Sequence, residues 1–113
     1  MNIRKYGNED SQSLIRLLET VFPDEPPHND PSKVLAAKLA IDDLIFVAED
    51  NKQIIGACIA GYDGHRGWLY AVSVLPVHRR TGVGTSLIKH ALRCLQDIGC
   101  TKVNLQIRSA NSE

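Results

Sequence analysis

The stretch from residue 68 to residue 98 constrains the fold more than any other part of this chain. An apolar run from Trp68 to Leu75 ends at a proline, and two arginines, a Gly-x-Gly turn and a long amphipathic segment follow. This order predicts a strand, a glycine loop and a helix. Glycines let a ligand approach the backbone, and the N–H groups at the start of a helix favour an anion. The segment therefore predicts a site for a pyrophosphate group.

Three known kinds of phosphate-binding loop are compared with this pattern. A P-loop needs a Lys followed by Ser or Thr directly after its last glycine, and no such Lys follows Gly84 here. A dinucleotide fingerprint accepts Gly82 and Gly84 but needs a third glycine where this chain has Leu87. The third pattern is Arg-x-x-Gly-x-Gly, which Arg79, Gly82 and Gly84 satisfy.

The third pattern resembles the acetyl-CoA loop of the GNAT superfamily of N-acetyltransferases. The segment Val72 to Pro76 is similar to that family's fourth strand with its terminal Val-x-Pro. The segment Gly61 to Gly67 resembles a small bacterial subgroup, the YpeA-like acetyltransferases, and Met1 to Arg4 resembles the first strand. The resemblance covers nearly the whole chain. It implies transfer of an acetyl group from acetyl-CoA to a primary amine, by direct attack in a ternary complex.

The resemblance also implies how the cofactor is held. Backbone N–H groups from Arg80 to Thr85 would bind the pyrophosphate, and the Thr85 hydroxyl would add to them. The strand edge at 72–74 would pair with the pantetheine arm, and an N–H near Val74 would polarise the thioester carbonyl, an effect worth ~3 kcal/mol. Asn111 would contact the cofactor from the start of a following helix. The implied cofactor-binding residues are Val72, Ser73, Val74, Arg79, Arg80, Thr81, Gly82, Val83, Gly84, Thr85 and Asn111.

The general base is harder to assign. Many GNAT enzymes use a Glu on the fourth strand, but the run from Trp68 to Leu75 contains no carboxylate. Asp63 and His65, in the adjacent hairpin, are the nearest titratable candidates for catalysis. The alternative, a turn-forming Asp and a surface His, stays open. In the family the loop at 26–29 borders the acceptor groove, and a plain connector is equally compatible with it.

Periodicity and turn residues predict one α/β domain over residues 1–113. The predicted order is β-α-α-β-β-β-α-β, a mixed central sheet flanked by helices. Asn8 or Asp10 can cap the first helix, Asp30 precedes the second, and Gly99 ends the third. The predicted strands are 2–6, 44–49, 53–62, 68–75 and one from Val103 through Ile107. One face of the third helix is expected to carry Val83, Leu87, Ala91, Leu92, Leu95 and Ile98.

GNAT domains usually continue beyond such a strand with another helix and two more strands. That helix often carries a Tyr that protonates the CoA thiolate, so the resemblance implies that a C-terminal helix and two strands are missing. A non-catalytic acyl-CoA-binding or interaction module therefore stays open beside the enzyme, as does a generic nucleotide-binding α/β domain. An uncovered strand from Val103 to Ile107 would invite pairing with a second copy, so we expect self-association, most simply as a two-fold homodimer, or else marginal stability.

Bulk properties exclude several classes of protein. The formal net charge is zero, with 13 basic and 13 acidic side chains, which gives no support for nucleic-acid binding. No apolar run approaches the ~20 residues of a membrane span, and no signal-peptide pattern is found, so a cytoplasmic location is expected. Cys58, Cys94 and Cys100 lack metal-ligand spacing and are expected to be buried, reduced thiols, with no metal site.

Overall fold

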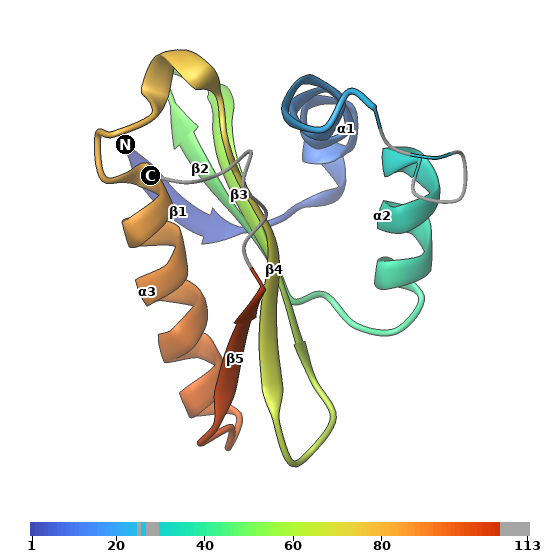
Figure 1. The fold of residues 1–113 in the computed structure, drawn as a ribbon, viewed down its shortest axis with the longest axis vertical. Coiled ribbons are helices and arrows are strands. Elements are labelled where there is room, and N and C mark those ends of the chain that lie inside the picture. Colours follow the sequence, from blue (N-terminus) through green and yellow to red (C-terminus); the bar gives the residue numbers. More distant parts are fainter. Residues whose placement is uncertain (25, 27–29, 107–113) are drawn as a thin grey trace.

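Helices cover both faces of a central sheet in the computed structural model of the chain (Figure 1). The structure describes residues 1–24, 26 and 30–106. Within them the elements follow the predicted order. The strands are β1 (Asn2–Lys5), β2 (Ile45–Asp50), β3 (Gln53–Tyr62), β4 (Gly67–Val74) and β5 (Val103–Gln106), and the helices are α1 (Ser11–Val21), α2 (Pro31–Leu39) and α3 (Val83–Asp97).

The sheet is mixed, as the sequence predicts. In the part of the chain that the structure describes, its strands lie in the order β1-β2-β3-β4-β5. The first four are antiparallel neighbours, and β5 joins β4 in parallel. A parallel neighbour needs a crossover, which α3 supplies. In Figure 1, α3 lies on one face of the sheet, and α1 and α2 lie on the other.

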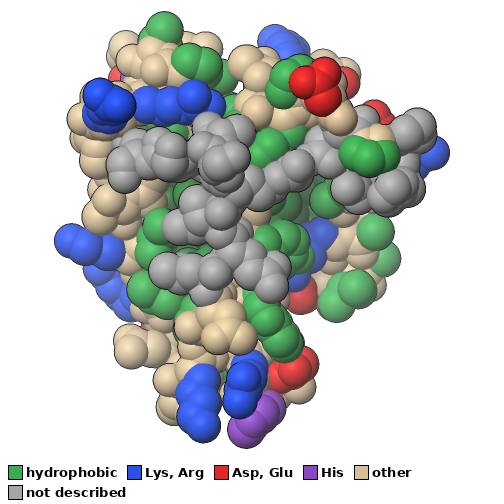
Figure 2. Space-filling model, in the orientation of Figure 1, with side chains coloured by type: hydrophobic (Ala, Val, Ile, Leu, Met, Phe, Trp, Pro, Cys, Tyr) green, Lys and Arg blue, Asp and Glu red, His purple; other side chains and the backbone are tan. Residues whose placement is uncertain are grey.

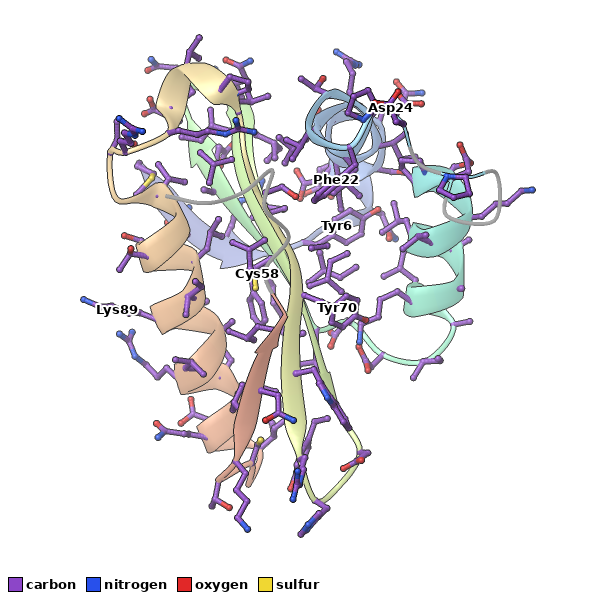
Figure 3. All side chains as sticks on the ribbon, viewed as in Figure 1. Tyr6, Phe22, Asp24, Cys58, Tyr70 and Lys89 are labelled. Carbon is purple, nitrogen blue, oxygen red and sulfur yellow. The ribbon has the colours of Figure 1, made fainter. Side chains whose placement is uncertain are left out.

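Two apolar clusters, one on each face of the sheet, form the core. The cluster under α3 includes Phe46, Cys58, Leu69, Leu87 and Leu95. The cluster under α1 and α2 includes Leu14, Leu18, Leu35, Val47 and Ile59. Cys58 points toward the α3 side in Figure 3, and burial raises the pKa of its thiol to about 12. All three cysteines are free thiols, as predicted, although Cys94 is only half-buried.

Two local predictions differ from the structure. Ile98 is 52% exposed and does not lie on the buried face of α3, because the helix ends at Asp97. Gly99, with φ 100°, then turns the chain away. Asp10 stands at the N-cap position of α1 but does not cap the helix. Its carboxylate is occupied by Arg4 and by the Gly7 N–H instead.

Some predictions fall on residues that the structure does not describe. The expected end of the last strand at Ile107 and the cofactor contact of Asn111 lie outside the described residues, as do three positions of the loop at 26–29. Among the helices of the described part, none combines the length and the apolar character that a membrane crossing requires.

Candidate active site

The connection from β4 to α3 reverses the chain in a short space. A 3₁₀ turn, Pro76–His78, follows the strand, and Arg79 is extended. Arg80 and Gly82 then take left-handed backbone conformations, with φ 65° and 87°, and α3 begins at Val83. Glycine suits such a φ because it has no Cβ. Among the described residues, no atom other than those of its chain neighbours lies within 4 Å of the point where a Cβ of Gly82 would stand.

The start of α3 has the features of an anion site. The Ser86 N–H donates to the Gly82 carbonyl at 3.0 Å as the first bond within the helix. The amides of Val83 and Thr85 precede it, where helix geometry supplies no acceptor inside the helix. Figure 2 shows Lys and Arg side chains over this end of the molecule, and Arg80 is exposed. The helix dipole and the positive charge together favour a phosphate ligand.

A β-bulge interrupts β4 midway along the strand. The register passes from Ala57 opposite Ser73 to Ile59 opposite Tyr70, so two residues of β4 oppose one of β3. Ala71 takes a left-handed φ of 51° there. Its carbonyl accepts a hydrogen bond of 3.0 Å from the hydroxyl of Ser73, which is completely buried. The sequence carries no glycine or asparagine that would indicate this bulge.

The bulge lies where the described pairing of β4 with β5 stops. That pairing runs from Gly67 opposite Val103 to Tyr70 opposite Gln106. Beyond it, the Leu75 N–H donates to the Ile55 carbonyl of β3 at 2.9 Å. Because neighbouring residues of a strand point their N–H and C=O groups to opposite edges, the groups of Val74 face the edge away from β3. The backbone of Val74 is therefore directed to the edge where the resemblance implies a pantetheine arm.

On the other face of the sheet, two adjoining pockets form a groove between α2 and the β3–β4 hairpin. Their volumes are about 430 Å³ and 320 Å³, and Lys38, Ile41 and Tyr70 line both. Tyr70 extends from β4 toward α2 in Figure 3. The Lys38 ammonium lies 2.8 Å from Asp42 Oδ1 and 5.9 Å from the centre of the Tyr70 ring. Lys38 is only 8% exposed, so one wall of the groove is a nearly buried lysine held between a half-buried aspartate and an aromatic ring.

Asp63 and Trp68 line the hairpin end of this groove. One carboxylate oxygen of Asp63 accepts the N–H groups of His65 and Arg66, each at 2.8 Å. These bonds, that of Arg66 first, lower the pKa of Asp63 and make it a weaker base.

Asp63 and the exposed His65 are also remote from the bulge. Asp63 is level with Arg66, whose carbonyl accepts the Asp63 N–H. From Arg66 to Ala71 the strand covers about 16 Å, since strands rise ~3.3 Å per residue, whereas direct proton transfer needs a contact of about 3 Å.

The structure thus brings some predicted site residues together and separates others. Residues 79–85 and the end of β4 lie together around the start of α3, whereas Asp63 and His65 lie at the opposite end of the same strand. Sequence reasoning missed the bulge, as well as the pairing of Lys38 with Asp42 and Tyr70. Within the described ranges, no group of three or more His, Cys, Asp or Glu side chains could hold a metal ion.

Comparisons with known proteins agree with this geometry. The sequence profile of the Acetyltransferase (GNAT) family matches residues 11–113. An acetyltransferase of Pectobacterium atrosepticum is 38% identical over 112 residues, which cover 98% of this chain and 79% of the relative. An acetyltransferase of Sodalis glossinidius is also 38% identical over 112 residues, which cover 98% of this chain and 78% of the relative.

Solved structures share the fold. A GNAT family acetyltransferase from Brucella melitensis, solved in complex with acetyl-CoA, has a TM-score of 0.77 and 26% identity. That match covers 92% of this chain and 73% of the other. The ribosomal-protein-S18-alanine N-acetyltransferase from Escherichia coli has a TM-score of 0.81 at 19% identity, covering 98% of this chain and 69% of the other, and supports the fold alone.

Proposed function

Because this chain belongs to the acetyltransferase (GNAT) family, we propose that it binds acetyl-CoA at the start of α3 and transfers the acetyl group to a primary amine. The observation that carries the proposal is the turn at Arg80 and Gly82, which sets the first amides of α3 beside the end of β4. The pyrophosphate would be held by backbone N–H groups from Arg80 to Thr85, with positive charge from the loop.

The pantetheine arm would continue from the pyrophosphate along the outer edge of β4. Val72 and Val74 direct their backbone groups to that edge, and the described part of β5 does not extend beside them. The Val74 N–H would then stabilise the oxygen of the reacting thioester, a contribution of ~3 kcal/mol in other acyl transfers. The bulge at Ala71 lies on the same strand, three residues before Val74.

The groove between α2 and the hairpin would admit the acceptor. Tyr70, the residue before the bulge, lines both pockets of the groove, so an amine there would approach the thioester from the face opposite α3. The amine nitrogen attacks the carbonyl carbon, the C–N bond forms, the C–S bond breaks and CoA leaves as a thiolate. The new amide nitrogen then loses a proton to solvent, and the thiolate takes one up. A protonated alkylamine must first lose a proton, which costs ~4.6 kcal/mol at pH 7 for a pKa of ~10.4.

Asp63 would interact with the acceptor amine as a carboxylate anion. Its lowered pKa keeps it ionised at neutral pH, so it would attract the protonated amine to the hairpin end of the groove. The predicted role of Asp63 or His65 in proton transfer is tested by Asp63→Asn and His65→Gln. An attracting role predicts that Asp63→Asn raises the KM for the amine several-fold with little change in kcat. A loss in kcat with a shifted pH–rate profile would support proton transfer instead.

Calorimetric titration tests the cofactor site. We expect acetyl-CoA to bind more tightly than NAD, and Arg80→Glu to weaken acetyl-CoA binding at least tenfold because it reverses the charge in the phosphate loop. Arg93→Glu, an equal charge reversal at an exposed position of α3, is the matched control and should change affinity less than twofold. Equal effects of the two variants would show that the pyrophosphate does not bind at this loop.

A CoA-release assay with a panel of primary amines tests the transfer. The rate should rise with pH as the acceptor loses its proton. Binding of acetyl-CoA without turnover on any amine would favour a non-catalytic acyl-CoA-binding module.

A further inference from the structure

The peptide group that joins Val74 to Leu75 is held from both sides. Its N–H donates to the Ile55 carbonyl at 2.9 Å, within the sheet. Its carbonyl accepts a hydrogen bond of 3.2 Å from Nε of Arg79, which reaches back from the loop. Because a peptide group is planar, these two bonds together fix its orientation at the end of β4.

From this geometry we infer that Arg79 is a positioning residue for the cofactor strand, acting through the Val74 carbonyl. The inference rests on the proposed function, since the Val74 N–H is the group proposed to meet the thioester oxygen. A fixed 74–75 peptide plane restricts the ψ angle of Val74, and so restricts the direction of the Val74 N–H relative to that plane. Oxyanion donors contribute most when their direction is set before the reaction.

The position of Arg79 separates its role from that of its neighbour. Arg79 is half-buried and its Nε lies on the strand, whereas Arg80 is exposed in the left-handed turn. The donor of the hydrogen bond to Val74 is Nε of Arg79, the fourth side-chain atom beyond Cα. In Arg79→Gln the amide nitrogen occupies that same place in the side chain, so the donor is kept and the charge is removed. Arg79→Met gives a side chain as long as that of the Gln variant but without a donor.

The experiment compares Arg79→Gln, Arg79→Met and a neutral control, Arg93→Met, in acetyl transfer. We expect Arg79→Met to lower kcat about tenfold with the KM for acetyl-CoA within twofold, because a charge-assisted hydrogen bond is lost and no phosphate contact is lost. Arg79→Gln should recover kcat to within about threefold of the parent. Equal losses in the Gln and Met variants, with weaker and more salt-sensitive CoA binding, would make Arg79 a phosphate ligand. Parent-like turnover in Arg79→Met would also overturn the inference.

A second measurement does not depend on activity. Exchange of the Leu75 amide hydrogen reports the clamped peptide directly, since that N–H belongs to it. In the protein without ligand, exchange should be at least tenfold faster in Arg79→Met than in the parent, and near the parent rate in Arg79→Gln. Unchanged exchange in both variants would overturn the inference even if acetyl-CoA binds as proposed. Faster exchange only in Arg79→Met would support it even if the chain transferred no acetyl group.

Discussion

Asp10 links the first strand to the first helix through contacts of its carboxylate. Arg4 donates to both oxygens, at 2.8 and 3.0 Å, and the Gly7 N–H donates to one of them at 2.8 Å. The hydrogen bond from Arg4 is the main cause that lowers the pKa of Asp10, and the Gly7 N–H adds to it. Because Asp10 is buried, replacing its carboxylate with a neutral side chain should lower the stability of the fold.

The lowered pKa predicts a loss of stability in acid. A depressed folded-state pKa stabilises the fold above the ordinary Asp value of ~3.9, and this contribution disappears as the pH falls through the folded-state pKa. Asp10→Asn should reduce the free energy of unfolding by about 1–3 kcal/mol at pH 7 and by less at pH 3. Urea unfolding at both pH values measures this.

The exposed Lys5–Asp43 pair provides a control at the same scale. Its ions lie 3.2 Å apart, but the Asp43 side chain is 71% exposed. Asp43→Asn should therefore change stability by less than about 0.5 kcal/mol. An equal cost for both substitutions would show that burial of Asp10 contributes nothing.

At the scale of elements, the turn before α3 and the tip of the β3–β4 hairpin offer a matched pair of glycines. Gly82 has φ 87° and Gly64 has φ 93°, and in the part of the chain that the structure describes neither has a non-neighbouring atom within 4 Å of the place of a Cβ. Alanine at either site should cost about 1 kcal/mol of stability, because only the backbone conformation is strained. Only Gly82→Ala should weaken acetyl-CoA binding, by about tenfold, since its methyl group would lie where the phosphate approaches.

Thermal unfolding and calorimetry together measure both effects. If Gly64→Ala weakened acetyl-CoA binding as much as Gly82→Ala, the loss would come from general destabilisation and not from the phosphate loop.

Local signals explain which elements could be predicted. The strand, glycine turn and helix around Gly82 are encoded by residues that are neighbours in sequence, so periodicity and turn chemistry suffice to predict them. The bulge at Ala71 is not encoded locally, because an alanine in the left-handed region is kept there by the Ser73 hydroxyl and by packing on both faces of the sheet. The Lys38–Tyr70 contact joins two elements 32 positions apart, so it depends on the docking of α2.

For the whole molecule, the comparisons confirm the family resemblance, and the fold confirms the mixed sheet. Assembly stays a prediction. In the described sheet β5 is the outermost strand beside β4. We expect pairing of two copies along this strand, which light scattering would detect as a dimer. Asn104→Lys places a charge at an exposed position of β5 and should shift the equilibrium toward monomer. A concentration-independent monomer for the unaltered chain would contradict this expectation.

The groove beside α2 contains the only tryptophan of the chain, so the fluorescence of this residue can report on the groove. Trp68 is half-buried and shares the pocket wall with Tyr70. Excitation near the red edge of the indole band would therefore report one place in the molecule, without a label. An amine that enters the groove should shift or quench the emission, whereas CoA bound alone at the start of α3 should leave it nearly unchanged. Emission that responds to CoA and to no amine would place the acceptor elsewhere.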